Sequence, residues 1–186
     1  MLFDKYISVL LFYDVAASQA AECSAPPATV DAAKPVRRLQ RAVEEMLAHY
    51  PCTAGLLIYN EGNDGLEVRY PMSAPCQSIT KGSSINGNGK QLSHDAVTNE
   101  TPPYGVHFHV AQANVSLADL GVVSIPHSAL DVLYPKKPIP HLDSKGHPLP
   151  RFVMAFQITT FKCGGFTLGH TCSHAYADGH TGVGIL

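Results

Sequence analysis

The pattern of hydrophobic and polar positions along the 186-residue chain predicts one helix and a larger number of strands. Apolar residues recur at helical spacing from Pro35 to Tyr50, and Pro51 ends this pattern. β-branched and aromatic residues gather in shorter runs that alternate with polar residues or stand between turn signals. These runs predict strands at residues 6–15, 54–59, 66–70, 106–110, 151–162 and 166–173.

Turn-forming residues divide these elements into hairpins and long connections. The Asn- and Gly-rich residues 60–65 predict one hairpin, and residues 163–165 (Cys-Gly-Gly) predict a second, tight one. Residues 71–103 are dominated by Pro, Ser, Gly and Asn and predict a long surface loop. The proline-rich residues 126–150 predict an extended surface connection, preceded by a short helix or turn at residues 115–120.

The overall composition is that of a globular domain. Hydrophobic residues make up 45% of the chain and charged residues 15%, which is unlike a disordered sequence. The formal charge of -2 gives no electrostatic footprint for nucleic acid or for an anionic membrane surface. No apolar run reaches the ~18 residues needed to span a bilayer. We therefore expect no nucleic-acid partner and no membrane association.

The cysteine pattern suits a reducing compartment. The five cysteines form no CxxC pair and no regular framework, so we expect free thiols that act as small buried hydrophobes. These residues are Cys23, Cys52, Cys76, Cys163 and Cys172.

The first residues also resemble a secretory signal peptide, with an apolar run at 7–13 and small residues at 17–20. Asp4 and Asp14 argue against that interpretation, and the same run predicts a strand, so we expect a cytoplasmic protein. The glycosylation sequons at Asn99 and Asn114 would matter only in a secreted chain.

A candidate catalytic residue follows the last predicted strand. His174 stands at the strand end, and Asp178-Gly179 follow four residues later. An imidazole titrates near neutral pH and can accept a proton from a hydroxyl or an amine. A strand end holds such a side chain more firmly than a mobile loop does. Taken alone, however, this short pattern fits a structural histidine better than a catalytic one.

The flanking residues strengthen the pattern. Residues 161–169 read Phe-Lys-Cys-Gly-Gly-Phe-Thr-Leu-Gly, and with His174-x-x-x-Asp178-Gly179 they are similar to the catalytic stretch of plant BAHD acyltransferases. Further matches lie in the family's order along the chain, so the resemblance covers nearly all of it. They are the opening strand at residues 4–13, the helix ending in Tyr-Pro-Cys-Thr-Ala-Gly at 35–55, Gly-Val-His-Phe at 105–108 and Ser-Leu-Ala-Asp-Leu at 116–120.

The resemblance implies an α/β fold, a mixed sheet with helices on one side, like one lobe of a chloramphenicol-acetyltransferase-like fold. It implies transfer of an acyl group from acyl-CoA, as a co-substrate and not a bound cofactor, to an alcohol or an amine. His174 would be the general base. Asp178 would be structural and point away from the substrate, and Gly179 would shape the turn.

Residues 1–186 would then be the amino-terminal lobe of a two-lobe enzyme. The family's second lobe carries an Asp-Phe-Gly-Trp-Gly motif, whereas this chain contains no tryptophan. The absence of that lobe puts catalysis by these 186 residues alone in doubt. The alternative is a non-catalytic truncated relative that acts as a binding or dimerisation module.

Two further chemistries can be weighed against acyl transfer. Zinc favours histidine and cysteine ligands, and a helix would place His170, His174 and Asp178 on one face. The glycine-rich residues before them favour a strand, so we expect no metal site in the whole cluster of His170, Cys172, His174, Asp178 and His180. Cys172 as a nucleophile has no evident partner base. His107 and His109 alternate with apolar neighbours and are expected to line a polar strand face.

Overall fold

The computed structural model describes residues 5–14, 33–70, 79–81, 105–120, 130–137 and 142–178. Its larger sheet has five strands in the order β1-β8-β7-β5-β4. β1, β8 and β7 are antiparallel, whereas β7, β5 and β4 run parallel, so the sheet is mixed as expected. The strands are β1 (Tyr6–Tyr13), β4 (Ile79–Lys81), β5 (Val106–Ala113), β7 (Met154–Phe161) and β8 (Phe166–Ser173).

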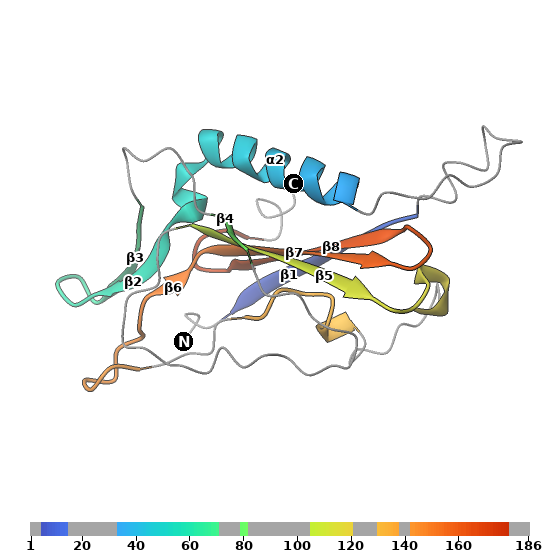
Figure 1. The fold of residues 1–186 in the computed structure, drawn as a ribbon. Helices are drawn as coiled ribbons and strands as arrows, with labels where there is room; N and C mark the ends of the chain where they lie inside the picture. Colours follow the sequence, from blue (N-terminus) through green and yellow to red (C-terminus); the bar gives the residue numbers. More distant parts are fainter. Residues whose placement is uncertain are drawn as a thin grey trace, which may run out of the picture.

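The helix α2 (Ala33–His49) lies across one face of this sheet (Figure 1). It begins two residues before Pro35, which the first helical turn tolerates because the N–H groups there have no intrahelical partner. Its apolar stripe buries Val43 and Leu47 against the sheet. The core between helix and sheet includes Val106, Phe108, Met154, Phe156, Ile158, Leu168 and Cys172.

A second sheet of three strands has the order β3-β2-β6. The predicted hairpin is formed by β2 (Leu56–Asn60) and β3 (Gly65–Arg69), and β6 (Arg151–Phe152) pairs with β2. The 3-10 turn η1 (Pro51–Ala54) joins α2 to β2. The turn and the second sheet lie at one end of the larger sheet (Figure 1).

The predicted strand at residues 151–162 is divided between the two sheets. Val153 interrupts it, because its N–H donates to the carbonyl of Gly55 at 3.3 Å while its carbonyl accepts the N–H of Ser173 at 2.9 Å. The chain therefore passes from β6 in the small sheet to β7 in the large one. A hydrophobic run cannot reveal such a change of partner, because the residues on both sides of it are buried or partly buried.

The hairpin of β7 and β8 matches its prediction closely. Gly164 has a φ of 83°, a conformation that favours glycine, and its N–H donates to the carbonyl of Phe161 at 3.0 Å. β8 begins and ends where the sequence predicts. The predicted turn at residues 115–120 is the 3-10 turn η2 (Leu117–Leu120).

The other face of the large sheet is covered in part by residues 130–137. The carbonyl of Leu133 lies so close to Gly169 that a Cβ atom there would come within 2.4 Å of it. The side-chain amide of Gln157 donates to the carbonyl of Val132 at 2.8 Å. This connection therefore packs tightly on the sheet, which the prediction of an extended surface segment did not include.

Two expectations need correction. β4 lies inside the stretch predicted to be loop, because its three residues pair in parallel with β5 at the sheet edge. Cys163 is exposed at the β7–β8 turn, so the prediction of a buried thiol is wrong there, although it is confirmed for Cys172. Cys23 and Cys76 lie outside the described residues, as does most of the predicted loop at 71–103. No described helix is long and apolar enough to cross a membrane.

Candidate active site

His174 is the first residue after β8, the strand between β1 and β7 in the large sheet. Its backbone N–H donates to the carbonyl of Lys5, just before β1, at 2.8 Å. Its side chain is exposed. The imidazole thus stands exposed at the end of an inner strand, while its backbone is hydrogen-bonded to the residue before β1.

The residues after His174 form a compact turn, which we call the motif turn (residues 174–178). The carbonyl of Ser173 accepts the N–H groups of Tyr176 at 3.0 Å and of Ala177 at 3.1 Å, and its hydroxyl accepts the N–H of Ala175 at 3.3 Å. Ser173 itself is fully buried. The turn is therefore anchored on a residue that cannot move without disturbing the core, and this rigidity suits a positioned proton acceptor.

The structure describes the rest of the predicted motif only as far as Asp178. Asp178 is exposed at the end of the motif turn and takes part in a polar interaction. Gly179 and His180 lie outside the described residues. The structural roles expected for Asp178 and Gly179 stay predictions.

The surroundings of the motif are apolar. His170, four residues upstream, is only 1% exposed, and burial lowers its pKa to about 4. Burial also raises the pKa of the Cys172 thiol, which disfavours the thiolate that a nucleophile requires. β8 is a strand, so the helical face that would align His170 with His174 does not exist. Within the described segments, no three His, Cys, Asp or Glu side chains are grouped to hold a metal ion.

His107 and His109 lie on β5, where Phe108 between them is fully buried in the core. Their rings stack at a centroid separation of 6.3 Å, and the ring of His107 also lies 4.7 Å from that of Phe152. Burial lowers the pKa of His109. The two histidines share one face of β5 as expected, but their contact with Phe152 and the burial of His109 make that face less polar than predicted.

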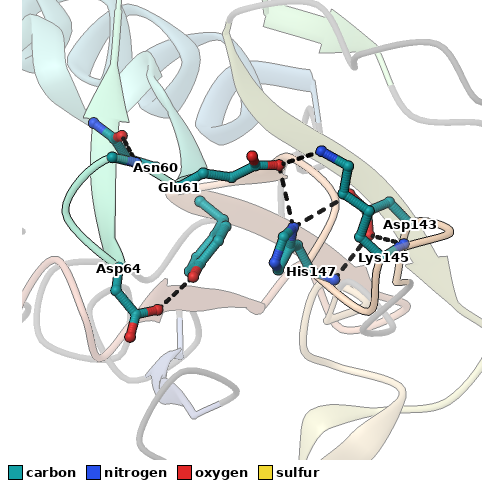
Figure 2. Close-up of polar contacts among 8 residues, drawn as sticks. Asn60, Glu61, Asp64, Asp143, Lys145 and His147 are labelled. Carbon is teal, nitrogen blue, oxygen red and sulfur yellow. Dashed lines mark hydrogen bonds and ion pairs between the residues drawn. The ribbon is translucent and has the colours of Figure 1, made fainter.

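A separate polar cluster lies at the tip of the β2–β3 hairpin (Figure 2). The carboxylate of Glu61 accepts from the Lys145 ammonium at 3.0 Å and lies 3.4 Å from Nδ1 of His147. The hydrogen bond from Lys145 lowers the pKa of Glu61. Asp143 accepts the N–H groups of Lys145 and His147, both at 2.8 Å, and the His147 bond is the main cause of its lowered pKa. Lys145 and Glu61 are well exposed, whereas Asp143 and His147 are partly buried, and together the four side chains join two surface loops.

One contact at the motif turn was not predicted from the sequence. The hydroxyl of Tyr176 lies 3.2 Å from Sγ of Cys52, which belongs to the η1 turn. The two residues are 124 positions apart, and no periodicity or spacing connects them. The only signal was that both fall inside family-like motifs.

Comparisons with known proteins agree with this arrangement. A family model described as "Transferase family" matches residues 100–186. A spermidine sinapoyl-CoA acyltransferase of Arabidopsis thaliana is 40% identical over 76 residues, which are 41% of this chain and 16% of that protein. A spermidine coumaroyl-CoA acyltransferase of the same plant is 28% identical over 148 residues, with 78% of this chain and 24% of that protein covered. The chain thus spans much less than two thirds of the length of these curated relatives.

The crystal structure of vinorine synthase shares the fold, with a TM-score of 0.53 and 18% sequence identity. The match covers 93% of this chain and 30% of vinorine synthase. The mixed sheet and the helix across it are those of a chloramphenicol-acetyltransferase-like fold. The chain is thus similar in sequence to plant acyl-CoA acyltransferases and similar in fold to vinorine synthase.

Proposed function

We propose that this chain supplies the catalytic base of an acyl-CoA-dependent acyltransferase, and that the base is His174. The observation that carries the proposal is the position of His174, exposed at the end of β8 with its backbone tied to Lys5 at 2.8 Å. A base must reach its substrate and keep its orientation, and this position meets both requirements.

The reaction transfers one proton and one acyl group. The imidazole of His174 accepts the proton of an acceptor O–H or N–H while the acceptor atom attacks the thioester carbonyl. The C–S bond then breaks, and CoA leaves as a thiolate that takes up the proton from the imidazolium. Proton transfer by a positioned side chain contributes about 10²–10⁴-fold to the rate. Asp178 and Gly179 are assigned structural roles at the motif turn.

An amine is the acceptor that we would test first. The two Arabidopsis relatives are named for spermidine, a polyamine, and for hydroxycinnamoyl-type CoA donors. We also propose a cytoplasmic location, supported by Cys52, Cys163 and Cys172, which are free thiols. The second lobe expected for the family would complete the substrate channel.

The test begins with the transcript downstream of the codon for Leu186. The protein that the whole reading frame encodes is purified, and release of CoA thiol from p-coumaroyl-CoA is measured with and without spermidine. Acceptor-dependent release that is lost in His174→Ala supports the proposal. Equal acceptor-dependent release by the parent and by His174→Ala would show that His174 is not the base. No release from a folded parent favours the alternative of a non-catalytic module.

A further inference from the structure

The contact between Cys52 and Tyr176 links two parts of the chain that are distant in sequence. Tyr176 stands in the middle of the motif turn, two residues after His174. Its hydroxyl and Sγ of Cys52 are 3.2 Å apart, within the range of a hydrogen bond that involves sulfur, and either atom can be the donor. The turn is thereby held by a side chain from the η1 turn as well as by the backbone carbonyl of Lys5.

The η1 turn that carries Cys52 is itself firmly fixed. The carbonyl of Tyr50 accepts the N–H of Thr53 at 3.0 Å and its hydroxyl at 2.7 Å, and the N–H of Gly55 donates to the carbonyl of Cys52 at 3.0 Å. The carbonyl of Ala54 accepts the N–H of Gly105, at the start of β5, at 2.8 Å. The Cys52 side chain is therefore held in a defined position and can in turn restrain a residue that binds to it.

The packing at Gly55 supports the same conclusion. A Cβ atom at this position would lie 2.7 Å from Cγ1 of Val68 and 2.9 Å from the carbonyl oxygen of Cys52. These distances are too short for any larger residue. The backbone at Gly55, three residues after Cys52, thus packs closely against β3.

Tyr176 is held on its apolar side as well. Its ring packs against the core cluster, and burial, followed by the bond to Cys52, raises the pKa of its hydroxyl. A tyrosine hydroxyl is neutral at physiological pH even at its ordinary pKa of 10.0, and the upward shift of the pKa keeps its capacity to donate. Loss of the Cys52 sulfur would leave a half-buried hydroxyl without this partner, which favours a shift of the turn.

We propose that Cys52 is a positioning residue for the catalytic base: through Tyr176 it fixes the motif turn, and with it the orientation of the His174 imidazole. This inference rests on the proposed function of His174. It assigns Cys52 no contact with substrate. Its effect arises because a base must stay close to its reacting geometry for efficient proton transfer.

The activity arm of the test uses the full-length protein with Cys52→Ala, Tyr176→Phe and the double variant. Each single change is expected to lower kcat about three- to tenfold, with little change in KM for acyl-CoA. The double variant should be no slower than the slower single variant, because both changes remove the same bond. Cys52→Ser keeps a hydrogen-bonding group and should retain most of kcat. Cys163→Ala, at the exposed β7–β8 turn, serves as the control.

A second experiment tests the hydrogen bond between Cys52 and Tyr176 independently of catalytic activity. Amide hydrogen exchange of a peptide that covers the motif turn is compared with that of the β7–β8 turn. Cys52→Ala and Tyr176→Phe should accelerate exchange severalfold in the motif turn only, while Cys52→Ser should not. Exchange that is unchanged in both variants overturns the proposal.

The two proposals fail in different ways. If His174→Ala is inactive but Cys52→Ala keeps its full kcat, the positioning role is overturned and the proposed function stands. If His174→Ala keeps its activity, the proposed function is wrong and the positioning role falls with it. Losses that multiply in the double variant also contradict a shared bond.

Discussion

The imidazole of His170 stacks on the ring of Phe156 at a centroid separation of 5.0 Å, inside the core of the large sheet. His170 is 1% exposed, and neither ring nitrogen has a hydrogen-bond partner in the described part of the chain. Burial lowers its pKa to about 4, from an ordinary value of 6.5. The folded protein therefore holds this histidine in its neutral form, at the cost of unsatisfied polar atoms.

Acidification should destabilise the protein through His170. Between pH 6.5 and about 4 the unfolded chain binds a proton at this residue that the folded chain does not, so stability falls as the pH is lowered through this window. The loss could reach about 3 kcal/mol. His170→Leu should remove this part of the pH dependence and be neutral or stabilising at pH 7. Urea unfolding at pH 7 and pH 4.5 measures both effects.

His49→Ala serves as the control, because His49 is exposed at the end of α2. It should keep the pH dependence of the parent. If His170→Leu loses stability with acid as steeply as the parent does, the assignment to His170 is wrong.

Gly169 should not tolerate a side chain. A Cβ atom there would lie 2.4 Å from the carbonyl oxygen of Leu133 and 3.2 Å from Cα of Tyr134, and backbone atoms cannot rotate away. Gly169→Ala should therefore lower the free energy of unfolding by about 1–3 kcal/mol or more, as overpacking does. Gly65→Ala is the matched control, because its nearest neighbour is a movable side-chain oxygen of Asn63 at 3.3 Å. Thermal unfolding of the two variants decides the matter: equal midpoints would show that residues 130–137 do not press on β8.

Asp143 should stabilise the loop of residues 143–147 locally and contribute little to the stability of the whole protein. Its carboxylate accepts the N–H groups of Lys145 and His147, both at 2.8 Å, and so closes the surface turn between them. Asp143→Ala should speed amide exchange at residues 143–147 severalfold and leave the midpoint of thermal unfolding nearly unchanged, since the site is exposed. Glu61→Gln, which weakens the exposed contacts of this carboxylate with Lys145 and His147, should change neither quantity. Faster exchange throughout the large sheet in Asp143→Ala would contradict this local role.

The parts of the fold that local patterns encode were predictable from the sequence. The helix, the two hairpins and β8 follow from apolar periodicity and from glycine at the turns. The position of His174 at the end of β8 was predicted from the same patterns, whereas its exposure was not. β4 was missed because three residues in a loop-like stretch pair with β5 by a long-range parallel contact.

Side-chain partners across the fold could not be predicted in the same way. The contact between Cys52 and Tyr176 joins positions 124 residues apart, and it depends on how the η1 turn packs beside the motif turn. The exposure of Cys163 has a similar origin, because the sequence places this thiol in a turn but does not show which way it faces. Such contacts are set by tertiary packing and not by local propensity.

The central claim is that His174 is the base of an acyl transfer, and one measurement tests it most directly. Release of CoA thiol is followed in the full-length protein and in His174→Ala, with His49→Ala as the histidine control and circular dichroism to verify folding. We expect His174→Ala to lose about 10²-fold or more of kcat and His49→Ala to keep it. A folded His174→Ala protein that retains most of the parent's kcat would contradict the account.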